Sequence, residues 1–366
     1  MFDDIRPYRN DEVHAVVQKL INEPEFMASV ANFALPKLHA AIPFLAKWLI
    51  KFSFQKKLKK LGGIEDIQLE VAKYLNKLIK QSTDGFSYDG IDRLDLKKPT
   101  LFMSNHRDIV LDVALINLAL HQNGADTVEA AVGDNLLHKP WVADLMRINK
   151  SFIVKRSEKT KRAMLAASKQ LSAYIHHVLV DNQQHLWIAQ REGRAKDGLD
   201  KTNAALISML LLNKPKEMPI AEYLDTLNIV PVSISYEYDP CDTDKAKELA
   251  QREVSGDYVK EEGEDFKSIT QGMAGYKGKV HLAFGTPIRG DFADSKAIAK
   301  AIDEQIIGQY KLYESNLSAH EKLANKSQTL VPHLQDRMQA LTPEQKKWLL
   351  TMYANPVAAK KALSES

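Results

Sequence analysis

The chain has 366 residues, of which 45% are hydrophobic and 27% are charged. This composition excludes a disordered chain, a collagen-like chain and a small protein held together by disulfides. Cys241 is the only cysteine, so an internal disulfide is excluded as well. The length suggests one large domain with extensions, or two domains. Fifty Lys and Arg against forty-seven Asp and Glu leave a net charge of +3, which points to no particular class of partner.

The first region of the chain, residues 1–90, is expected to be helical and to end in the turn-rich segment 82–90. It contains a charge asymmetry, because no acidic residue occurs between Phe26 and Ile64. The same stretch carries seven lysines, which are Lys37, Lys47, Lys51, Lys56, Lys57, Lys59 and Lys60.

After Pro43 this stretch has helical periodicity, which places four apolar side chains on one face. They are Leu45, Trp48, Leu49 and Phe52. A basic amphipathic helix with an aromatic anchor is typical of a segment that lies in a membrane interface. The alternative is a helix that packs on the domain and leaves its lysines in water. No run of about 18 uncharged apolar residues occurs, so no helix is predicted to cross the bilayer. The N-terminus is acidic and polar, unlike a secretory signal, so we expect a peripheral or monotopic protein on the cytoplasmic face of the membrane.

The second region, residues 91–315, alternates apolar strands with helices. Strands are predicted at 99–105, 127–134, 151–155, 185–190, 228–238 and 279–285, and helices at 110–120, 138–148, 159–180, 203–212 and 295–310. Such alternation predicts an α/β fold with a mostly parallel mixed sheet flanked by helices. Residues 240–275 are expected to be a charged surface insertion. The last region, residues 316–366, is expected to be a tail of short helices, with Thr342 capping the one that starts at Pro343.

The segment after the first of these strands carries candidate catalytic side chains. Ligand sites in open α/β sheets form at the carboxyl ends of strands, and His106 follows the strand that ends near Asn105. An imidazole oriented by a carboxylate can take a proton from an alcohol. Asp112 and Asp108 are both candidate orienting residues for His106. Asp108 is also well placed to cap a helix that begins at Ile109.

Cations follow two further strands. Lys155 and Arg156 end one strand, and the segment 190–196 places three cations around a glutamate and a glycine after another. Arg156, Arg194, Lys155, Arg191 and Lys196 could converge on a phosphate, because guanidinium groups bind phosphate through paired charge-assisted hydrogen bonds. Glu192 could hold one arginine or accept from a substrate hydroxyl, and Gly193 would permit close backbone approach.

Taken in order, four short blocks resemble those of the glycerolipid acyltransferase superfamily, the glycerol-3-phosphate and lysophosphatidate acyltransferases. They are Asn105-His106, the segment 153–156, Glu192-Gly193 and the segment 229–232, and the resemblance covers about residues 99–290. The chain departs from the family at two places. The aspartate comes one residue late, since position 111 is Leu and Asp112 follows. Arg194 stands where the family has Thr, so that Lys196 must serve beside it. The continuation of the last block is closer to the glycerol-3-phosphate enzymes.

The resemblance implies an O-acyltransferase of glycerolipid biosynthesis. The donor would be acyl-CoA or acyl carrier protein, and the acceptor a hydroxyl of glycerol-3-phosphate or a lysophospholipid, with His106 as general base. No cofactor is expected beyond the thioester co-substrate. Neither a bound metal nor a nucleic-acid partner is expected. Two alternatives stay open, a non-catalytic lipid-binding protein with this fold and a metal-assisted phosphoester hydrolase using Asp108, Asp112 and His106.

Overall fold

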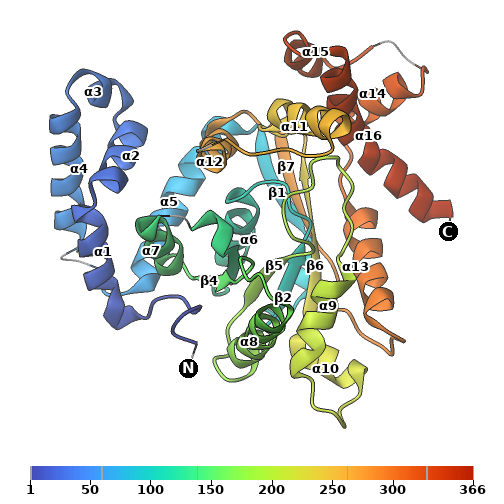
Figure 1. Ribbon diagram of the computed structural model, residues 1–366, viewed down its shortest axis with the longest axis horizontal. Helices are drawn as coiled ribbons and strands as arrows, with labels where there is room; N and C mark the ends of the chain where they lie inside the picture. Colours follow the sequence, from blue (N-terminus) through green and yellow to red (C-terminus); the bar gives the residue numbers. More distant parts are fainter. Residues whose placement is uncertain (1, 59–60, 138, 262, 327–328, 366) are drawn as a thin grey trace. The chain divides into compact units, whose positions relative to one another are not determined.

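The computed structural model describes residues 2–58, 61–137, 139–261, 263–326 and 329–365 (Figure 1). Lys59 and Lys60 of the basic stretch lie outside the described residues. Two compact units make up the chain, Met1–Tyr74 with Glu129–Ala167 and Leu75–Val128 with Ser168–Ser366. Both units are discontinuous in the sequence, in contrast to the three consecutive regions 1–90, 91–315 and 316–366 of the prediction.

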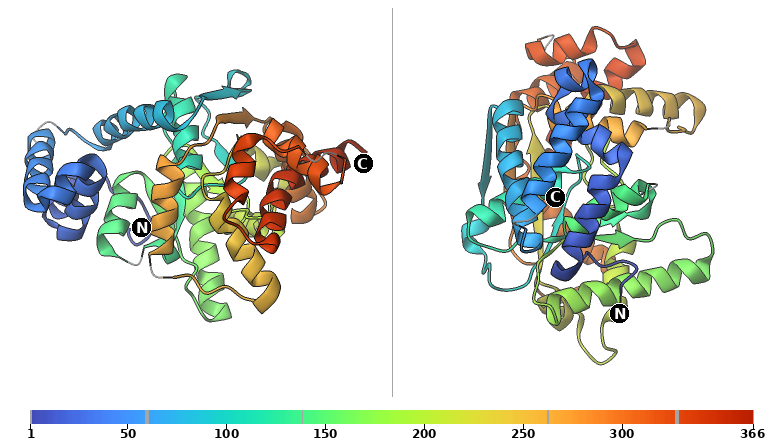
Figure 2. Two further views of the ribbon diagram at one scale, coloured as in Figure 1. Left: turned by 90° about the horizontal axis from the view of Figure 1, so that it is seen from above. Right: turned by 90° about the vertical axis from the view of Figure 1, so that its left-hand side faces the viewer.

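The first unit is mainly helical (Figure 2). Its elements are η1 (Asn10–Glu12), α1 (Val13–Asn22), α2 (Pro24–Ala34), α3 (Pro36–Ala41), α4 (Pro43–Leu58), the start of α5 (Ile64–Ser82), β3 (Glu129–Gly133), η3 (Asp134–Leu136), α7 (Pro140–Ile148), β4 (Ser151–Val154) and the start of α8 (Lys161–Val180). Proline occupies the first position of α2, α3, α4 and α7, where its missing N–H costs no helical hydrogen bond. The strands β3 and β4 pair in parallel.

The helix α4 has one packed face and one exposed face. Ala46 and Leu58 are buried, and Ile50 and Phe54 pack on the core that α1, α2 and α7 build. The large apolar side chains on the other side are exposed, and they include Phe44, Leu45, Trp48, Leu49 and Phe52. The expected apolar face therefore exists, and it is turned away from the core of its own unit.

The second unit contains a mixed sheet. Its strands are β1 (Gly85–Asp89), β2 (Leu101–Ser104), β5 (Leu186–Ala189), β6 (Ile229–Tyr236) and β7 (Lys279–Phe284), in the order β1-β7-β6-β2-β5. Only β6 and β7 pair in antiparallel fashion among these neighbours. All residues of β2 and β6 are buried, as in a sheet covered on both faces. The predicted fold class, a mostly parallel mixed sheet flanked by helices, is confirmed.

The helical elements of the second unit, besides the remaining parts of α5 and α8, are η2 (Ile91–Arg93), α6 (Leu111–Gln122), α9 (Ala204–Leu210), η4 (Leu211–Asn213), α10 (Ile220–Leu227), α11 (Asp242–Ser255), α12 (Glu264–Ala274), α13 (Ser295–Gln309), α14 (Glu314–Leu323), α15 (Pro332–Met338) and α16 (Pro343–Glu365). The segment 240–275 thus consists largely of α11 and α12. Its charged residues are not all on the surface, since Asp242, Lys245 and Glu248 are buried.

Two local predictions are wrong. The segment 82–90 is not a turn, because Gly85–Asp89 forms β1 and pairs in parallel with β7. Its alternation of exposed and half-buried residues is that of an edge strand, which the Gly and Asp residues of the segment concealed. The helix after His106 begins at Leu111 instead of Ile109.

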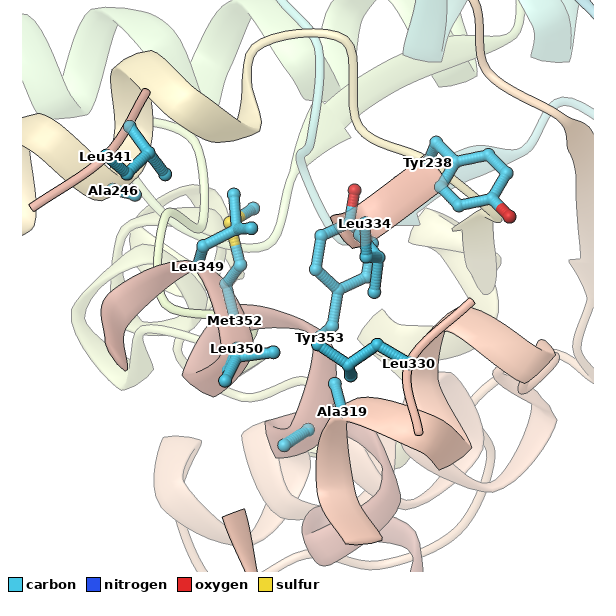
Figure 3. Close-up of a cluster of buried hydrophobic side chains, with 11 residues drawn as sticks. Tyr238, Ala246, Ala319, Leu330, Leu334, Leu341, Leu349, Leu350, Met352 and Tyr353 are labelled. Carbon is cyan, nitrogen blue, oxygen red and sulfur yellow. The ribbon is translucent and has the colours of Figure 1, made fainter. Parts of the chain in front are cut away.

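The C-terminal helices share a hydrophobic cluster with α11 (Figure 3). Ala246 of α11 packs there with Leu334 of α15 and with Leu349, Met352 and Tyr353 of α16. Thr342 caps α16 as expected, with its hydroxyl accepting from Gln345 N at 3.4 Å. At 23 residues, α16 is much longer than a short tail helix. The described helices include none with the length and apolar content that a membrane span requires.

Candidate active site

Three parallel strands bring the site together at one edge of the sheet. The strands β2, β5 and β6 run in the same direction, so their carboxyl ends meet at that edge. His106 follows β2, the segment 190–196 follows β5, and Tyr236 is the last residue of β6. This is the position at which open α/β sheets place their ligands.

His106 and Asp112 form a hydrogen-bonded pair. The Nδ1 atom of His106 lies 2.9 Å from Oδ2 of Asp112. A carboxylate can only accept, so Nδ1 carries the proton and Nε2 is the basic nitrogen. The His106 side chain is 15% exposed and the Asp112 side chain 1%. The ring of His106 also packs edge-on against Trp187 of β5, with centroids 5.7 Å apart. The imidazole is therefore fixed in orientation and remains accessible.

Asp112 is held by groups from three directions. Its Oδ2 accepts from the backbone N–H of Arg107 at 2.6 Å and of Asp108 at 3.0 Å, in addition to the imidazole. Its Oδ1 accepts from the hydroxyl of Tyr236 at 2.9 Å. Burial, together with the charge of Asp112, raises the pKa of Tyr236 well above its usual value, which keeps this hydroxyl a donor. Because α6 begins only at Leu111, the Asp112 carboxylate reaches the ring although it comes one residue later in the sequence than the resemblance requires.

Asp108, the other candidate orienting residue, has a capping role in the structure. Its Oδ1 accepts from the backbone N–H groups of Val110 at 2.9 Å and Leu111 at 2.8 Å, at the start of α6. Burial raises the pKa of Asp108, and the charge of Asp112 adds to that effect. The structure thus places Asp112, and not Asp108, against the imidazole.

The loop after β5 is bonded to the loop that carries the histidine. The N–H of Ala195 donates to the carbonyl oxygen of His106 at 2.8 Å. Gly193 has a φ of +72°, so a side chain at this position would be strained. The space where its Cβ would lie is open. Glu192 is exposed and Arg194 is half-buried. These residues belong to the same unit and the same strand edge as His106.

Lys196 is engaged elsewhere. Its Nζ forms an ion pair with Glu248 of α11, to which Arg252 also binds at 2.9 Å. Burial lowers the pKa of Lys196, and the nearby charge of Arg194 acts in the same direction. The structure therefore uses Lys196 to attach the loop to α11, a contact that the spacing of the block did not indicate.

Lys155 and Arg156 belong to the first unit. Lys155 Nζ pairs with Asp4 Oδ2 at 2.6 Å. The backbone N–H of Arg156 donates to Asp134 Oδ1 at 3.0 Å, and the side chain of Arg156 lies over Gly133, where a Cβ would come within 3.1 Å of it. Both cations follow β4, as the sequence predicted.

Sequence reasoning missed the buried ion pair beside the histidine. Arg107 Nη2 donates to Asp200 Oδ2 at 2.5 Å, and Asn105 Nδ2 donates to the same oxygen at 3.1 Å. Asn105 also bonds both backbone groups of Ile234 in β6. It missed Tyr236 too. The only signal for these contacts was the adjacency of β2 and β6, which periodicity does not reveal.

The part of the chain that the structure describes contains no cluster of three or more His, Cys, Asp or Glu side chains that could hold a metal ion. Two of the described histidines bond to other side chains, His281 to Ser87 and His177 to Asp181.

Comparisons with known proteins bear on this site. No curated protein sequence matches the chain. Among solved structures, the chain is similar to the crystal structure of the 1-acyl-sn-glycerophosphate (LPA) acyltransferase PlsC from Thermotoga maritima, with a TM-score of 0.40 and 14% identity over 76% of this chain and 91% of that one. A family model described as Acyltransferase matches residues 85–235, which include His106, Asp112 and the loop after β5. The chain thus carries an acyltransferase domain at these residues.

Proposed function

We propose that this acyltransferase moves a fatty acyl group from a thioester, acyl-CoA or acyl carrier protein, to a hydroxyl of glycerol-3-phosphate or a lysophospholipid. The observation that carries the proposal is the pair of His106 and Asp112, in which Asp112 accepts from the ring, two backbone N–H groups and Tyr236. Such a carboxylate orients the imidazole and stabilises the imidazolium that forms when His106 takes a proton.

The reaction needs one base and no covalent enzyme intermediate. Nε2 of His106 takes the proton of the acceptor hydroxyl while its oxygen attacks the thioester carbonyl carbon. The new C–O bond forms, the C–S bond breaks, and the leaving thiolate receives the proton from the imidazolium. Asp112 stays ionised throughout and stabilises the transient positive charge on the ring.

The acceptor phosphate is proposed to bind to the loop after β5. Arg194 supplies a guanidinium, Gly193 leaves its backbone open to a ligand, and Glu192 lies beside them. Lys155 and Arg156 belong to the first unit, and their part in binding a phosphate stays a prediction from their block. Lys196 takes a smaller part, because Glu248 already neutralises it.

We propose that α4 docks the protein on the cytoplasmic face of a membrane. Trp48 and Phe52 are 52% and 58% exposed, and their rings stack with centroids 5.9 Å apart. Lys47 and Lys56 lie on the same helix, which has no acidic residue. Exposed aromatic rings beside cations fit the boundary between the headgroups and acyl chains of an anionic bilayer.

The proposed reaction is tested with the purified full-length protein, a long-chain acyl-CoA or acyl carrier protein, and three acceptors. Glycerol-3-phosphate, a lysophosphatidate and phosphate-free glycerol are compared by release of free thiol and by analysis of the lipid product. Thiol release is expected with a phosphate-bearing acceptor and not with glycerol. A protein that binds these lipids and releases no thiol would instead be the non-catalytic alternative.

A further inference from the structure

The C-terminal helix α16 lies outside the residues that the acyltransferase family model matches, yet it contacts the loop between β5 and α9. Asn355 Nδ2 donates to the carbonyl oxygen of Asp197 at 2.7 Å. One residue further, Gly198 packs against the backbone of Met352, a residue shown in Figure 3. The middle of this loop is therefore in contact with α16.

The contact with Gly198 is unusually close. A Cβ at this position would lie 2.1 Å from the Met352 carbonyl oxygen, which no real side chain tolerates. Gly198 also has a φ of +79°, so glycine is required here both for backbone conformation and for space. Pro356 stands four residues after Met352 inside α16 and lacks an N–H. The Met352 carbonyl therefore has no donor at the usual helical position, and it faces the loop.

The same loop is bonded to the residues on both sides of His106. Ala195 N–H donates to the His106 carbonyl oxygen at 2.8 Å. Arg107 donates to the carbonyl oxygen of Gly198 at 3.4 Å and to Asp200 at 2.5 Å. Asp200, Arg107 and Asn105 are all buried, so these contacts are shielded from water. The loop thus connects α16 with the segment that carries the histidine.

The helix α16 is itself firmly attached. The hydroxyl of Tyr353 donates to Asp242 Oδ2 at 2.7 Å and accepts from Asp239 N at 2.9 Å. Leu349, Met352 and Tyr353 belong to the buried cluster with α11 and α15. The loop between β5 and α9 contacts this firmly attached helix closely, so it has little freedom to move.

We propose that α16 is a positioning element of the acyltransferase site. It holds the segment 194–200 in place and thereby sets where Arg194 meets the phosphate of the acceptor. The inference rests on the proposed function for its kinetic consequence, whereas the contact itself is independent of that function. The imidazole is oriented by Asp112, which the backbone N–H groups of Arg107 and Asp108 and the hydroxyl of Tyr236 hold, so the effect falls on acceptor binding more than on proton transfer.

The test compares two glycine variants in the full-length protein. Gly198→Ala introduces a methyl group against Met352, and Gly256→Ala is the matched control, because Gly256 has a φ of +77° and nothing within 4 Å of its Cβ position. Gly198→Ala is expected to raise the Michaelis constant for the acceptor at least about tenfold, since small misplacements of binding groups have large effects. The constant for the thioester donor and the values for Gly256→Ala should stay within about twofold of wild type.

Hydrogen exchange gives a readout that needs no activity. Amides of residues 194–200 should exchange faster in Gly198→Ala than in wild type or Gly256→Ala. An unchanged acceptor constant with unchanged exchange at residues 194–200 would overturn the inference. If wild type shows no acyl transfer, the proposed function fails, and the exchange measurement alone decides on the contact.

A second variant covers the case in which Gly198→Ala does not fold. Asn355→Ala removes one hydrogen bond to the loop and should raise the acceptor constant about two- to tenfold, the range that a single hydrogen bond provides. Its control is Thr351→Ala on the same helix, whose hydroxyl donates to Lys347 O within α16. Equal constants for the Asn355 and Thr351 variants, with equal exchange at residues 194–200, would contradict the role of α16.

Discussion

The loop between β2 and α6 buries polar side chains, whereas α4 exposes apolar ones. Asn105, Arg107, Asp108 and Asp112 are each at most 6% exposed, while Phe44 of α4 is 81% exposed. Globular proteins ordinarily do the opposite, and each departure costs free energy unless a partner compensates it. In the loop the compensating partners are within the protein, as hydrogen bonds to every one of these residues. In α4 the rings remain exposed among the described residues, and the partner that we propose for them is the membrane.

The largest loss of activity is expected when the base in the buried loop is removed. His106→Ala should lower turnover at least about 100-fold, because a positioned general base usually contributes that much. The control is His177→Ala, since His177 forms a similar pair with Asp181, at 2.6 Å, on the surface. Steady-state rates with saturating donor and acceptor provide the measurement. Turnover of the His106 variant within about threefold of wild type would remove His106 from the mechanism.

The network around the base should show a graded loss. Asp112→Asn replaces an acceptor of the Nδ1 proton by an amide and should lower turnover at least about tenfold. Tyr236→Phe removes one donor to the same carboxylate and should have a smaller effect, about two- to tenfold, equal to one hydrogen bond. Steady-state rates at saturating donor and acceptor rank the two variants against wild type. A larger loss for Tyr236→Phe than for Asp112→Asn would contradict this order.

The acceptor site is probed by comparing two cations of one loop. Arg194→Ala should raise the Michaelis constant for the acceptor about tenfold with little effect on the donor, because a charge-assisted bond to phosphate is lost. Lys196→Ala should do less, since Lys196 is paired with Glu248. Initial rates at varied acceptor concentration measure both. A selective effect of Arg194→Ala on the donor would mean that this cation binds the carrier.

The exposed face of α4 is probed with anionic vesicles at two salt concentrations. Trp48→Ala with Phe52→Ala should weaken sedimentation even at high salt, since apolar insertion is not screened. Lys47→Gln with Lys56→Gln should weaken it only at low salt, by about 1 kcal/mol per charge. Val254→Ala with Val259→Ala is the control, because both valines are exposed, at 83% and 80%, and are not part of α4. Full-length protein that stays in the supernatant at low salt would refute docking through α4.

The smallest effect concerns Asp108. Asp108→Ala should lower the free energy of unfolding by about 0.5–2 kcal/mol, because the cap of α6 is lost, and Asp108→Asn should lose less, because an amide oxygen can still accept. The pKa of Asp108 is raised by burial, so the folded state holds its proton more tightly than the unfolded state. The stabilisation from that proton is present at low pH and is lost as the pH rises through the raised pKa. Denaturant unfolding at several pH values should therefore show wild type losing stability relative to Asp108→Asn as the pH rises. A constant difference would contradict a raised pKa.

Much of the fold could be predicted because its strands are short apolar runs between clear turn residues. The strands β2, β5 and β6 are buried throughout or nearly so, and they stood out for that reason. The edge strand β1 was missed because Gly85, Ser87 and Asp89 alternate with aromatic residues and read as a turn. The residue composition of a segment therefore predicts whether a strand is buried more directly than it predicts which strand it pairs with.

The site was predictable where a motif lies within one segment. His106 and Asp112 are six residues apart, and their geometry depends only on how α6 begins. Tyr236 reaches Asp112 from a position 124 residues later, and Lys196 reaches Glu248 across 52 residues. Such contacts depend on strand order and on the packing of α11, which no local pattern encodes.

The burial of Cys241 has a practical consequence for measuring the enzyme. Its side chain is 2% exposed, and burial raises the pKa of the thiol to about 12. Thiol reagents react with the thiolate form and need access to the sulfur, so the folded protein should leave them nearly unconsumed. Coloured disulfide reagents can then report every turnover directly in the reaction mixture, and slow labelling of Cys241 would record global unfolding in the same cuvette.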